Sequence, residues 1–229
     1  MLLRLQSLYI PNSKNNDLIR LFTSIIHNKK IRFLIIPIGI EQLVNNNNLS
    51  HANYLIFDFE LMEVERFEPH GSTVPYGLNY NPSLLDDILE ARFRGIDEKI
   101  KYIKPKDYLP KVGFQFMDAY EDKKKKIGDP SGFCALWSIW YVDMRLTYKE
   151  LDRKSLVKLL LKSIRNQNVS YKNMIRNYSQ NIIQIRDKVL QKSNMDINDW
   201  LNDEYNDDQI NSFVRILVNE ITSNIDVGR

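Results

Sequence analysis

The segment that most constrains the fold is residues 51–68, HANYLIFDFELMEVERFE. Two runs rich in hydrophobic residues flank a short polar interruption, and this pattern predicts a β-hairpin. If the turn is centred on Phe59–Glu60, opposed residues lie at equal distances from that centre. This register pairs apolar residues on one face: Leu55 with Val64, and Phe57 with Met62.

The same register places His51 opposite Glu68, at the two ends of the hairpin. An ionised carboxylate within hydrogen-bond reach would fix the tautomer of the imidazole and favour its charged form. The alternative is an exposed cross-strand contact that stabilises the hairpin only weakly. We therefore predict that the two side chains are hydrogen-bonded and treat them as candidate catalytic residues.

The rest of the chain predicts an α+β fold with a mixed central sheet. Apolar patterns indicate strands at 31–40, where Pro37 marks an edge or a bulge, and at 108–120. Amphipathic patterns indicate helices at 17–27 and 83–94, followed by three charged amphipathic segments after residue 150. No repeat recurs at a fixed period. The expected organisation is a core over residues 1–150 and a C-terminal helical layer over 151–229 packed on it.

Cys134 lies in the segment GDPSGFCALWSIWYVD, which predicts a buried helix from about Ser131 to Leu146. Asp129 or Ser131 could cap this helix, and Pro130 suits its start. A helix N-terminus carries partial positive charge, which lowers the pKa of a thiol toward its reactive form. The plainer interpretation is that Cys134 is a small apolar core residue.

Taken together, His51, Glu68 and Cys134 resemble the adenovirus maturation proteinase and ubiquitin-like-protein-specific protease superfamily. That superfamily has the chain order histidine, acid, glutamine, cysteine. The segment FEP-x-G, from Phe67 to Gly71, is similar to the adenovirus-type version, in which the glutamate has the same 17-residue offset from the histidine. The resemblance covers roughly residues 31–146.

The chain departs from this pattern at two places. The family usually has tryptophan after the histidine, where this chain has Ala52. The glutamine that stabilises the oxyanion usually lies a few residues before the cysteine, whereas the candidate here, Gln115, lies 19 residues upstream. Otherwise Asp129 or the backbone N–H groups of the helix start would fill that role.

The resemblance implies a cysteine peptidase or isopeptidase that forms an acyl-enzyme, with ubiquitin-like conjugates or viral precursor proteins as substrates. It also implies a virus or an intracellular microbe as the source. Two alternatives remain open. One is an acetyltransferase of the YopJ type, which uses the same triad. The other is a protein-binding module with a catalytically decayed site, which Ala52 and the displaced glutamine make conceivable.

Composition excludes several other classes of function. The net charge is +3, too balanced for a basic nucleic-acid coat. The KKKK run at 123–126 could touch nucleic acid or an acidic substrate surface, but it is more simply a solvated loop, so nucleic acid is a possible partner without support. A single cysteine favours a reducing, intracellular compartment and cannot build a structural zinc site. No glycine-rich phosphate loop and no run of about 18 apolar residues is present, so we expect no cofactor, no metal and no membrane span.

Overall fold

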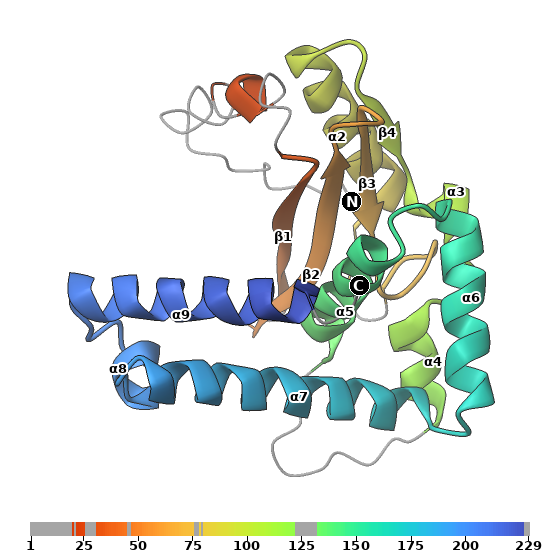
Figure 1. Ribbon diagram of the computed structural model, residues 1–229. Helices are drawn as coiled ribbons and strands as arrows, with labels where there is room; N and C mark the ends of the chain where they lie inside the picture. The colour runs from red at the N-terminus through yellow and green to blue at the C-terminus, as the bar shows by residue number, and fades with distance from the viewer. Residues whose placement is uncertain are drawn as a thin grey trace. The chain divides into compact units, whose positions relative to one another are not determined.

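The computed structural model describes residues 20, 22–25, 31–44, 47–75, 78, 80–121 and 132–226. It divides into two compact units, Met1–Ile175 and Arg176–Arg229. The first unit contains a four-stranded mixed sheet with helices, and the described part of the second is helical (Figure 1). The predicted α+β class with a mixed sheet is therefore confirmed.

The sheet has the strand order β1-β2-β3-β4. Its strands are β1 (Phe33–Val44), β2 (Asn47–Asp58), β3 (Glu63–Phe67) and β4 (Lys101–Ile103). β1 pairs antiparallel with β2, β2 pairs antiparallel with β3, and β3 pairs parallel with β4. The strand predicted at 31–40 is thus β1, and its Pro37 lies on an edge strand, as expected. Both strands of this pair are longer than the sequence predicted, since β1 continues to Val44 and β2 begins at Asn47.

Besides the helical residues 20 and 22–25, eight helices are described along the chain. They are α2 (Pro82–Ile96), α3 (Pro105–Tyr108), α4 (Phe114–Glu121), α5 (Cys134–Thr147), α6 (Arg153–Asn166), α7 (Tyr171–Lys192), α8 (Ile197–Leu201) and α9 (Asp207–Asp226). The helix expected at 83–94 is confirmed as α2. Its cap is local: the Asn81 side chain accepts hydrogen bonds from the backbone N–H groups of Ser83 and Leu84, and Pro82 occupies the first turn.

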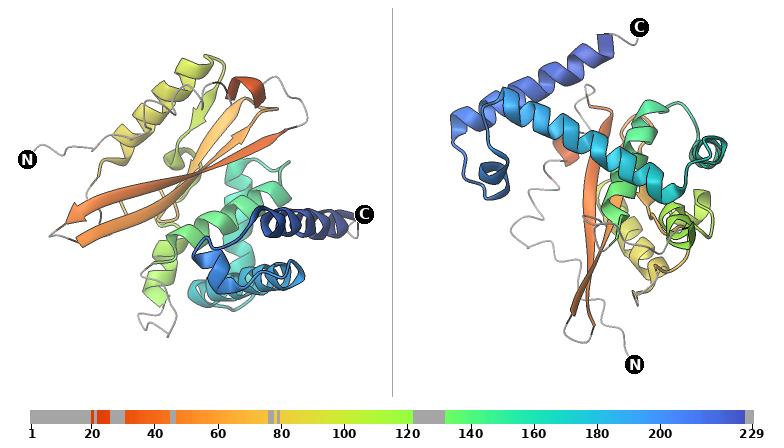
Figure 2. Two further views of the ribbon diagram at one scale, coloured as in Figure 1. Left: turned by 90° about the vertical axis from the view of Figure 1, so that its left-hand side faces the viewer. Right: turned by 90° about the horizontal axis from the view of Figure 1, so that it is seen from below.

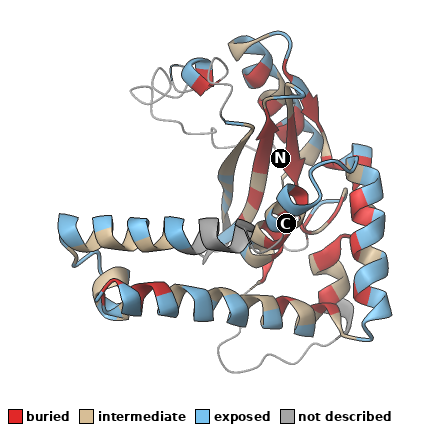
Figure 3. Cartoon of the chain, viewed as in Figure 1, coloured by how far each residue is buried: buried red, intermediate tan, exposed pale blue. Residues whose placement is uncertain are grey.

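Helices cover both faces of the sheet, α2 on one face and α5 on the other (Figure 2). On the α2 face, side chains of the hairpin and of α2 form the main apolar cluster together with Phe22 and two residues at β4: Phe22, Leu55, Phe57, Val64, Leu85, Leu89, Phe93, Ile100 and Tyr102. On the α5 face, the ring of Phe67 stacks on Tyr141 with centroids 4.0 Å apart. β2 and β3 are therefore the most deeply buried strands (Figure 3).

The strand predicted at 108–120 is wrong, because this stretch forms the short helix α3, a connection and the helix α4. In α4, Phe114 and Asp118 are buried one helical turn apart. Asp118 is inside because its Oδ2 accepts a hydrogen bond from Trp137 Nε1 at 2.8 Å. Because this buried position holds an acidic residue, the apolar residues of α4 do not recur at helical spacing, and the hydrophobicity pattern does not indicate a helix.

The helix expected to be buried nearly all round, α5, buries only one side. Trp137, Trp140 and Tyr141 are buried, whereas Asp143 and Leu146 are exposed. Its predicted caps, Asp129 and Ser131, lie outside the described residues. Most of the helix expected at 17–27 also lies outside them, although residues 22–25 are helical.

The three amphipathic segments expected after residue 150 are α6, α7 and α9, and the short helix α8 was not foreseen. α6 begins after Asp152, whose side chain accepts a hydrogen bond from the backbone N–H of Ser155. In the second unit, the ring of Trp200 lies against Tyr205 and Phe213. The contacts group α6 with the first unit, and the domain boundary placed after residue 150 stays a prediction.

Candidate functional site

His51 and Glu68 are hydrogen-bonded across the β2–β3 hairpin, as predicted. His51 Nε2 lies 2.8 Å from Glu68 Oε1, and the two side chains are only 4% and 2% exposed. The contact is therefore a buried ion pair when the histidine is protonated, and not the exposed cross-strand contact that was the alternative.

The register that brings these residues together differs from the predicted one. The turn occupies four residues, Phe59–Met62, so Phe57 pairs with Val64 and not with Met62. The pairing is shifted by two positions along β3. Because side chains alternate between faces with a period of two, an even shift leaves His51 and Glu68 on the same face. They are diagonal neighbours, not directly opposed ones.

Cys134 is the first residue of α5, and its thiol hydrogen-bonds to the His51 side chain. The backbone N–H of Ala52 also donates to the thiol, and the Ala52 carbonyl accepts from Ser138 Oγ at 3.4 Å. The β2–β3 ladder stops at the pair of Tyr54 and Phe67, so β3 does not occupy this edge of β2. The start of α5 therefore lies against the strand that carries the histidine.

The three groups alter one another's pKa values. Burial lowers the pKa of His51, but hydrogen bonds to Cys134 and Glu68 outweigh burial and raise that pKa to about 9. Burial raises the pKa of the Cys134 thiol, but the hydrogen bonds with His51 and Ala52 bring it below its usual value. Burial likewise opposes ionisation of Glu68, and the hydrogen bond from His51 lowers its pKa. The arrangement favours a thiolate beside an imidazolium, the nucleophilic form of cysteine.

Gln115 lies in the first turn of α4 and not at the end of a strand, which corrects its predicted setting. Its backbone N–H donates to the Pro69 carbonyl at 3.0 Å, so the segment after Glu68 holds the start of α4. A Cβ atom built on Gly132 would lie 3.3 Å from Gln115 Nε2. Gln115 is therefore next to the backbone that leads into Cys134, despite the 19-residue separation. The competing candidate, Asp129, lies outside the described residues.

Sequence reasoning missed the side chains that surround Glu68: Asn53, Arg66, His70 and Tyr80. Asn53 Nδ2 donates to Glu68 Oε2 at 3.0 Å, and the Tyr80 hydroxyl donates to the same oxygen at 3.2 Å. The His70 ring packs edge-on to that of His51, with centroids 5.2 Å apart. A signal was present, because Asn53 and Arg66 share the core-facing side of the hairpin with apolar residues, and a polar residue in such a place marks a buried network.

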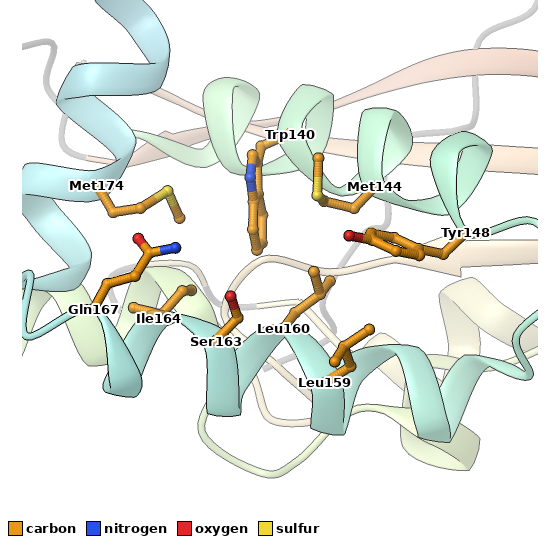
Figure 4. A pocket seen from close by; sticks show the side chains of 9 residues that line it. All are labelled: Trp140, Met144, Tyr148, Leu159, Leu160, Ser163, Ile164, Gln167 and Met174. Carbon is orange, nitrogen blue, oxygen red and sulfur yellow. The ribbon is translucent and has the colours of Figure 1, made fainter. Parts of the chain in front are cut away.

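Other features of the described residues do not add to this site. A cavity of about 300 Å³ is lined by nine residues from α5, α6, α7 and the positions that directly follow α5 and α6, and Trp140 and Met144 project into it from α5 (Figure 4). None of the nine belongs to the cysteine site. No cluster of three metal-binding side chains occurs in the described part of the chain. Among the described helices, none is both long and apolar enough to cross a membrane. The KKKK run lies outside the described residues.

Comparison with known proteins shows similarity to a viral protein. No protein-family profile matches the chain, and no solved structure matches it. A putative ankyrin repeat protein of Acanthamoeba polyphaga mimivirus is 42% identical over 223 residues, a match that covers 94% of this chain. The chain spans only 28% of the length of that relative. Ankyrin repeats are helix pairs that recur about every 33 residues, and the described part of this chain is instead built around a mixed sheet.

This similarity corrects the interpretation drawn from the motif order. The relative is described by ankyrin repeats and not as a protease, so membership of the adenovirus proteinase and ubiquitin-like-protein-specific protease superfamily is wrong. The peptidase function inferred from it, with its ubiquitin-like or precursor substrates, is wrong for the same reason. That the relative is viral agrees with the expected kind of source. The catalytic roles of His51, Glu68, Cys134 and Gln115 stay predictions, as does the acetyltransferase alternative.

Proposed function

We propose that this chain is a protein-binding domain with a nucleophilic cysteine. The similarity to a viral protein described by its ankyrin repeats supports binding, because repeat proteins of that class expose extended surfaces that bind other proteins. The setting proposed with it is intracellular, where a single cysteine remains reduced.

One observation carries the chemical half of the proposal: the thiol of Cys134, the imidazole of His51 and the carboxylate of Glu68 are hydrogen-bonded in sequence. A thiol held in this way ionises below its ordinary pKa of about 8.5. The residue is half-buried, so a small reagent can still reach it.

The test uses the fact that Cys134 is the sole cysteine of the chain. Iodoacetamide modification, followed by whole-protein mass, therefore reports on this site alone. We expect the rate of the native protein to stay high at pH 6, where an ordinary thiol is almost entirely protonated. The same protein unfolded in urea is the matched control, with the same cysteine and no site. Identical pH profiles for the two would contradict the nucleophilic half.

Binding is tested separately with immobilised protein and an amoeba lysate, because the relative comes from an amoeba virus. A specific partner should be retained by the native chain and by the Cys134→Ala variant alike, and free chain should displace it. A protein that the native chain retains no better than a urea-unfolded sample does would count against the binding half.

A second candidate function is a thiol-dependent enzyme. The position of the Gln115 amide beside Gly132 favours it, because an N–H donor near the nucleophile can stabilise an oxyanion. In such a reaction the thiolate adds to a carbonyl carbon, His51 protonates the leaving group, and water then releases the acyl group. p-Nitrophenyl acetate tests this: a burst of one nitrophenolate per chain followed by turnover is expected. Rapid alkylation of the thiol at pH 6 without turnover of the ester would contradict the enzyme function. The binding domain with a nucleophilic cysteine would then be the remaining proposal.

A further inference from the structure

A row of buried polar groups with alternating charge leads from α2 to the cysteine. It passes along Asp86, Arg66, Asn53, Glu68, His51 and Cys134. Four of them have almost no exposure: Asn53, Arg66, Glu68 and His51 are 0%, 1%, 2% and 4% exposed. In so dry a place each polar atom needs a partner, so the orientation of each group constrains the next.

Glu68 divides its hydrogen bonds between its two oxygens. Oε1 accepts from His51 Nε2 at 2.8 Å and from the backbone N–H of His70 at 2.9 Å. Oε2 accepts from Asn53 Nδ2 and from the Tyr80 hydroxyl. With four donors in place, the carboxylate can turn away from His51 only by breaking bonds on both oxygens.

Asn53 connects this carboxylate to a buried cation. Its Nδ2 donates to Glu68, while its Oδ1 accepts from Arg66 Nη1 at 2.5 Å. Arg66 Nη1 is itself 3.6 Å from Glu68 Oε2. The amide is thus fixed in one orientation, because turning it over would place like groups against each other on both sides.

Arg66 is held in turn by α2. Its Nε donates to Asp86 Oδ1 at 2.8 Å, and the Tyr102 hydroxyl donates to the same oxygen at 2.9 Å. The guanidinium therefore lies between two carboxylates, Asp86 and Glu68, and offsets the charge of both. A lysine at this position keeps the charge but cannot reproduce the forked contacts with both partners.

We infer that Asn53 and Arg66 are positioning residues of the cysteine site: they keep Glu68 ionised and turned toward His51, and so set the reactivity of Cys134. This inference rests on the proposed nucleophilic function. Neither residue contacts the thiol, so each acts through Glu68. Tyr80 contributes in the same direction through one weaker hydrogen bond.

The neighbouring residue of β3 supplies a matched control. Glu65 points to the opposite face of the sheet, where it pairs with the buried Arg145. Arg66 and Arg145 are therefore both buried arginines in ion pairs with a carboxylate. Only Arg66 is connected to Glu68, through its hydrogen bond to Asn53. Replacing either by lysine should destabilise the fold, and only Arg66→Lys should alter the thiol.

The experiment measures the iodoacetamide rate against pH for the full chain and its variants. Asn53→Leu removes the amide hydrogen bonds with Glu68 and Arg66 at similar side-chain size. Arg66→Lys removes the guanidinium contacts that join Asn53 and Asp86. In each we expect the midpoint of the profile to rise by about one pH unit, so the rate at pH values well below the native midpoint falls about tenfold. Tyr80→Phe should give a smaller shift in the same direction, and Arg145→Lys should leave the midpoint unchanged.

Thermal unfolding shows which variants are folded and can be compared. If Asn53→Leu does not fold, Tyr80→Phe, which loses a single hydroxyl, decides the matter. Folded variants at positions 53, 66 and 80 that all keep the native profile would overturn the inference while leaving the nucleophilic cysteine intact. A native protein whose profile matches its urea-unfolded form would instead overturn the proposed function itself.

Discussion

Gly71 and Gly113 lie with their backbones in direct contact. A Cβ atom built on Gly113 would be 2.3 Å from the amide nitrogen of Gly71, and one on Gly71 would be 2.6 Å from the amide nitrogen of Gly113. Gly71 also has φ near +100°, a conformation that side chains with a Cβ rarely adopt. Gly71 follows Glu68 by three residues and Gly113 precedes Gln115 by two, so this contact fixes the distance between the end of the hairpin and the start of α4.

Gly113→Ala is therefore expected to push the two segments apart and lower stability by about 2 kcal/mol or more, since backbone and not a flexible side chain must move. Thermal unfolding measures the loss. Gly95→Ala is the control, because it lies within α2 with nothing within 4 Å of its added Cβ. That change should be neutral or stabilise by up to about 1 kcal/mol. Equal effects at the two glycines would contradict the contact.

Lowering the pH from 6.5 to 4 should destabilise the protein through His70. Burial lowers the pKa of His70 to about 4, with a smaller lowering by the charge of His51 and an opposing effect of Glu68. The unfolded chain binds this proton near pH 6.5 and the folded chain does not, so stability falls as pH drops between the two values. The loss from this residue amounts to at most about 3 kcal/mol.

His70→Phe keeps a ring against His51 and removes the titration. Urea unfolding at a series of pH values should then show a flatter dependence between pH 6.5 and 4 than in the native protein. A slope as steep as the native one would assign the acid sensitivity in this range to groups other than His70. Glu68 is not one of them, because its lowered pKa means that its contribution to stability is lost only at still lower pH.

Arg145→Met should cost about 3–5 kcal/mol, because it removes one cation from Glu65, which is buried on the α5 face. Arg153, whose Nε also donates to Glu65, remains and keeps the effect toward the lower end. The comparison is Arg94→Ala, which breaks a surface pair with Glu90 where Arg94 is 65% exposed. That pair should contribute no more than about 0.5 kcal/mol. Urea unfolding of both variants gives the two values, and similar losses would contradict the burial argument.

Gln115→Ala separates the two candidate chemistries of the cysteine. Alkylation by iodoacetamide forms no oxyanion, so its rate at pH 6 should be unchanged. Turnover of p-nitrophenyl acetate does form one, and we expect it to fall about 10²–10³-fold if the amide is the donor. Gln167→Ala, at the end of α6 and outside the site, is the control. Unchanged turnover would leave stabilisation of the oxyanion to backbone N–H groups.

The local patterns of the sequence predicted much of the fold. A continuous apolar run located β1, and regular apolar patterns located the hairpin and α2, because the hairpin and α2 bury apolar side chains at regular intervals. The same reasoning failed to predict α4, because its core position Asp118 is acidic and is buried only through a hydrogen bond with Trp137, 19 residues away. The hairpin register was wrong for a related reason. A turn of four residues that ends with Met62 at φ 51 has no glycine or asparagine to mark it.

The sequence predicted the candidate site residues His51, Glu68 and Cys134, but not the buried polar residues that surround Glu68. His51 and Glu68 could be paired because a register error of two residues preserves the face. Asn53 and Arg66 could be marked as buried polar residues, but their network could not be assigned, since Asp86 of α2 meets Arg66 only after α2 has packed on the sheet. The order of the residues also suggested a peptidase family, and the relative that the whole chain resembles corrected that suggestion.

The hairpin origin of the imidazole–carboxylate pair has a consequence for how the protein folds. His51 and Glu68 are 17 residues apart in the chain, whereas the bond from Ser138 to Ala52 spans 86 residues. Short loops close at lower entropic cost, so the hairpin can assemble before α5 reaches it. A nascent chain that has emerged from the ribosome as far as the hairpin would thus already hold His51 and Glu68 next to each other. The nucleophile would arrive last, and the thiol would stay an ordinary one until the core had closed.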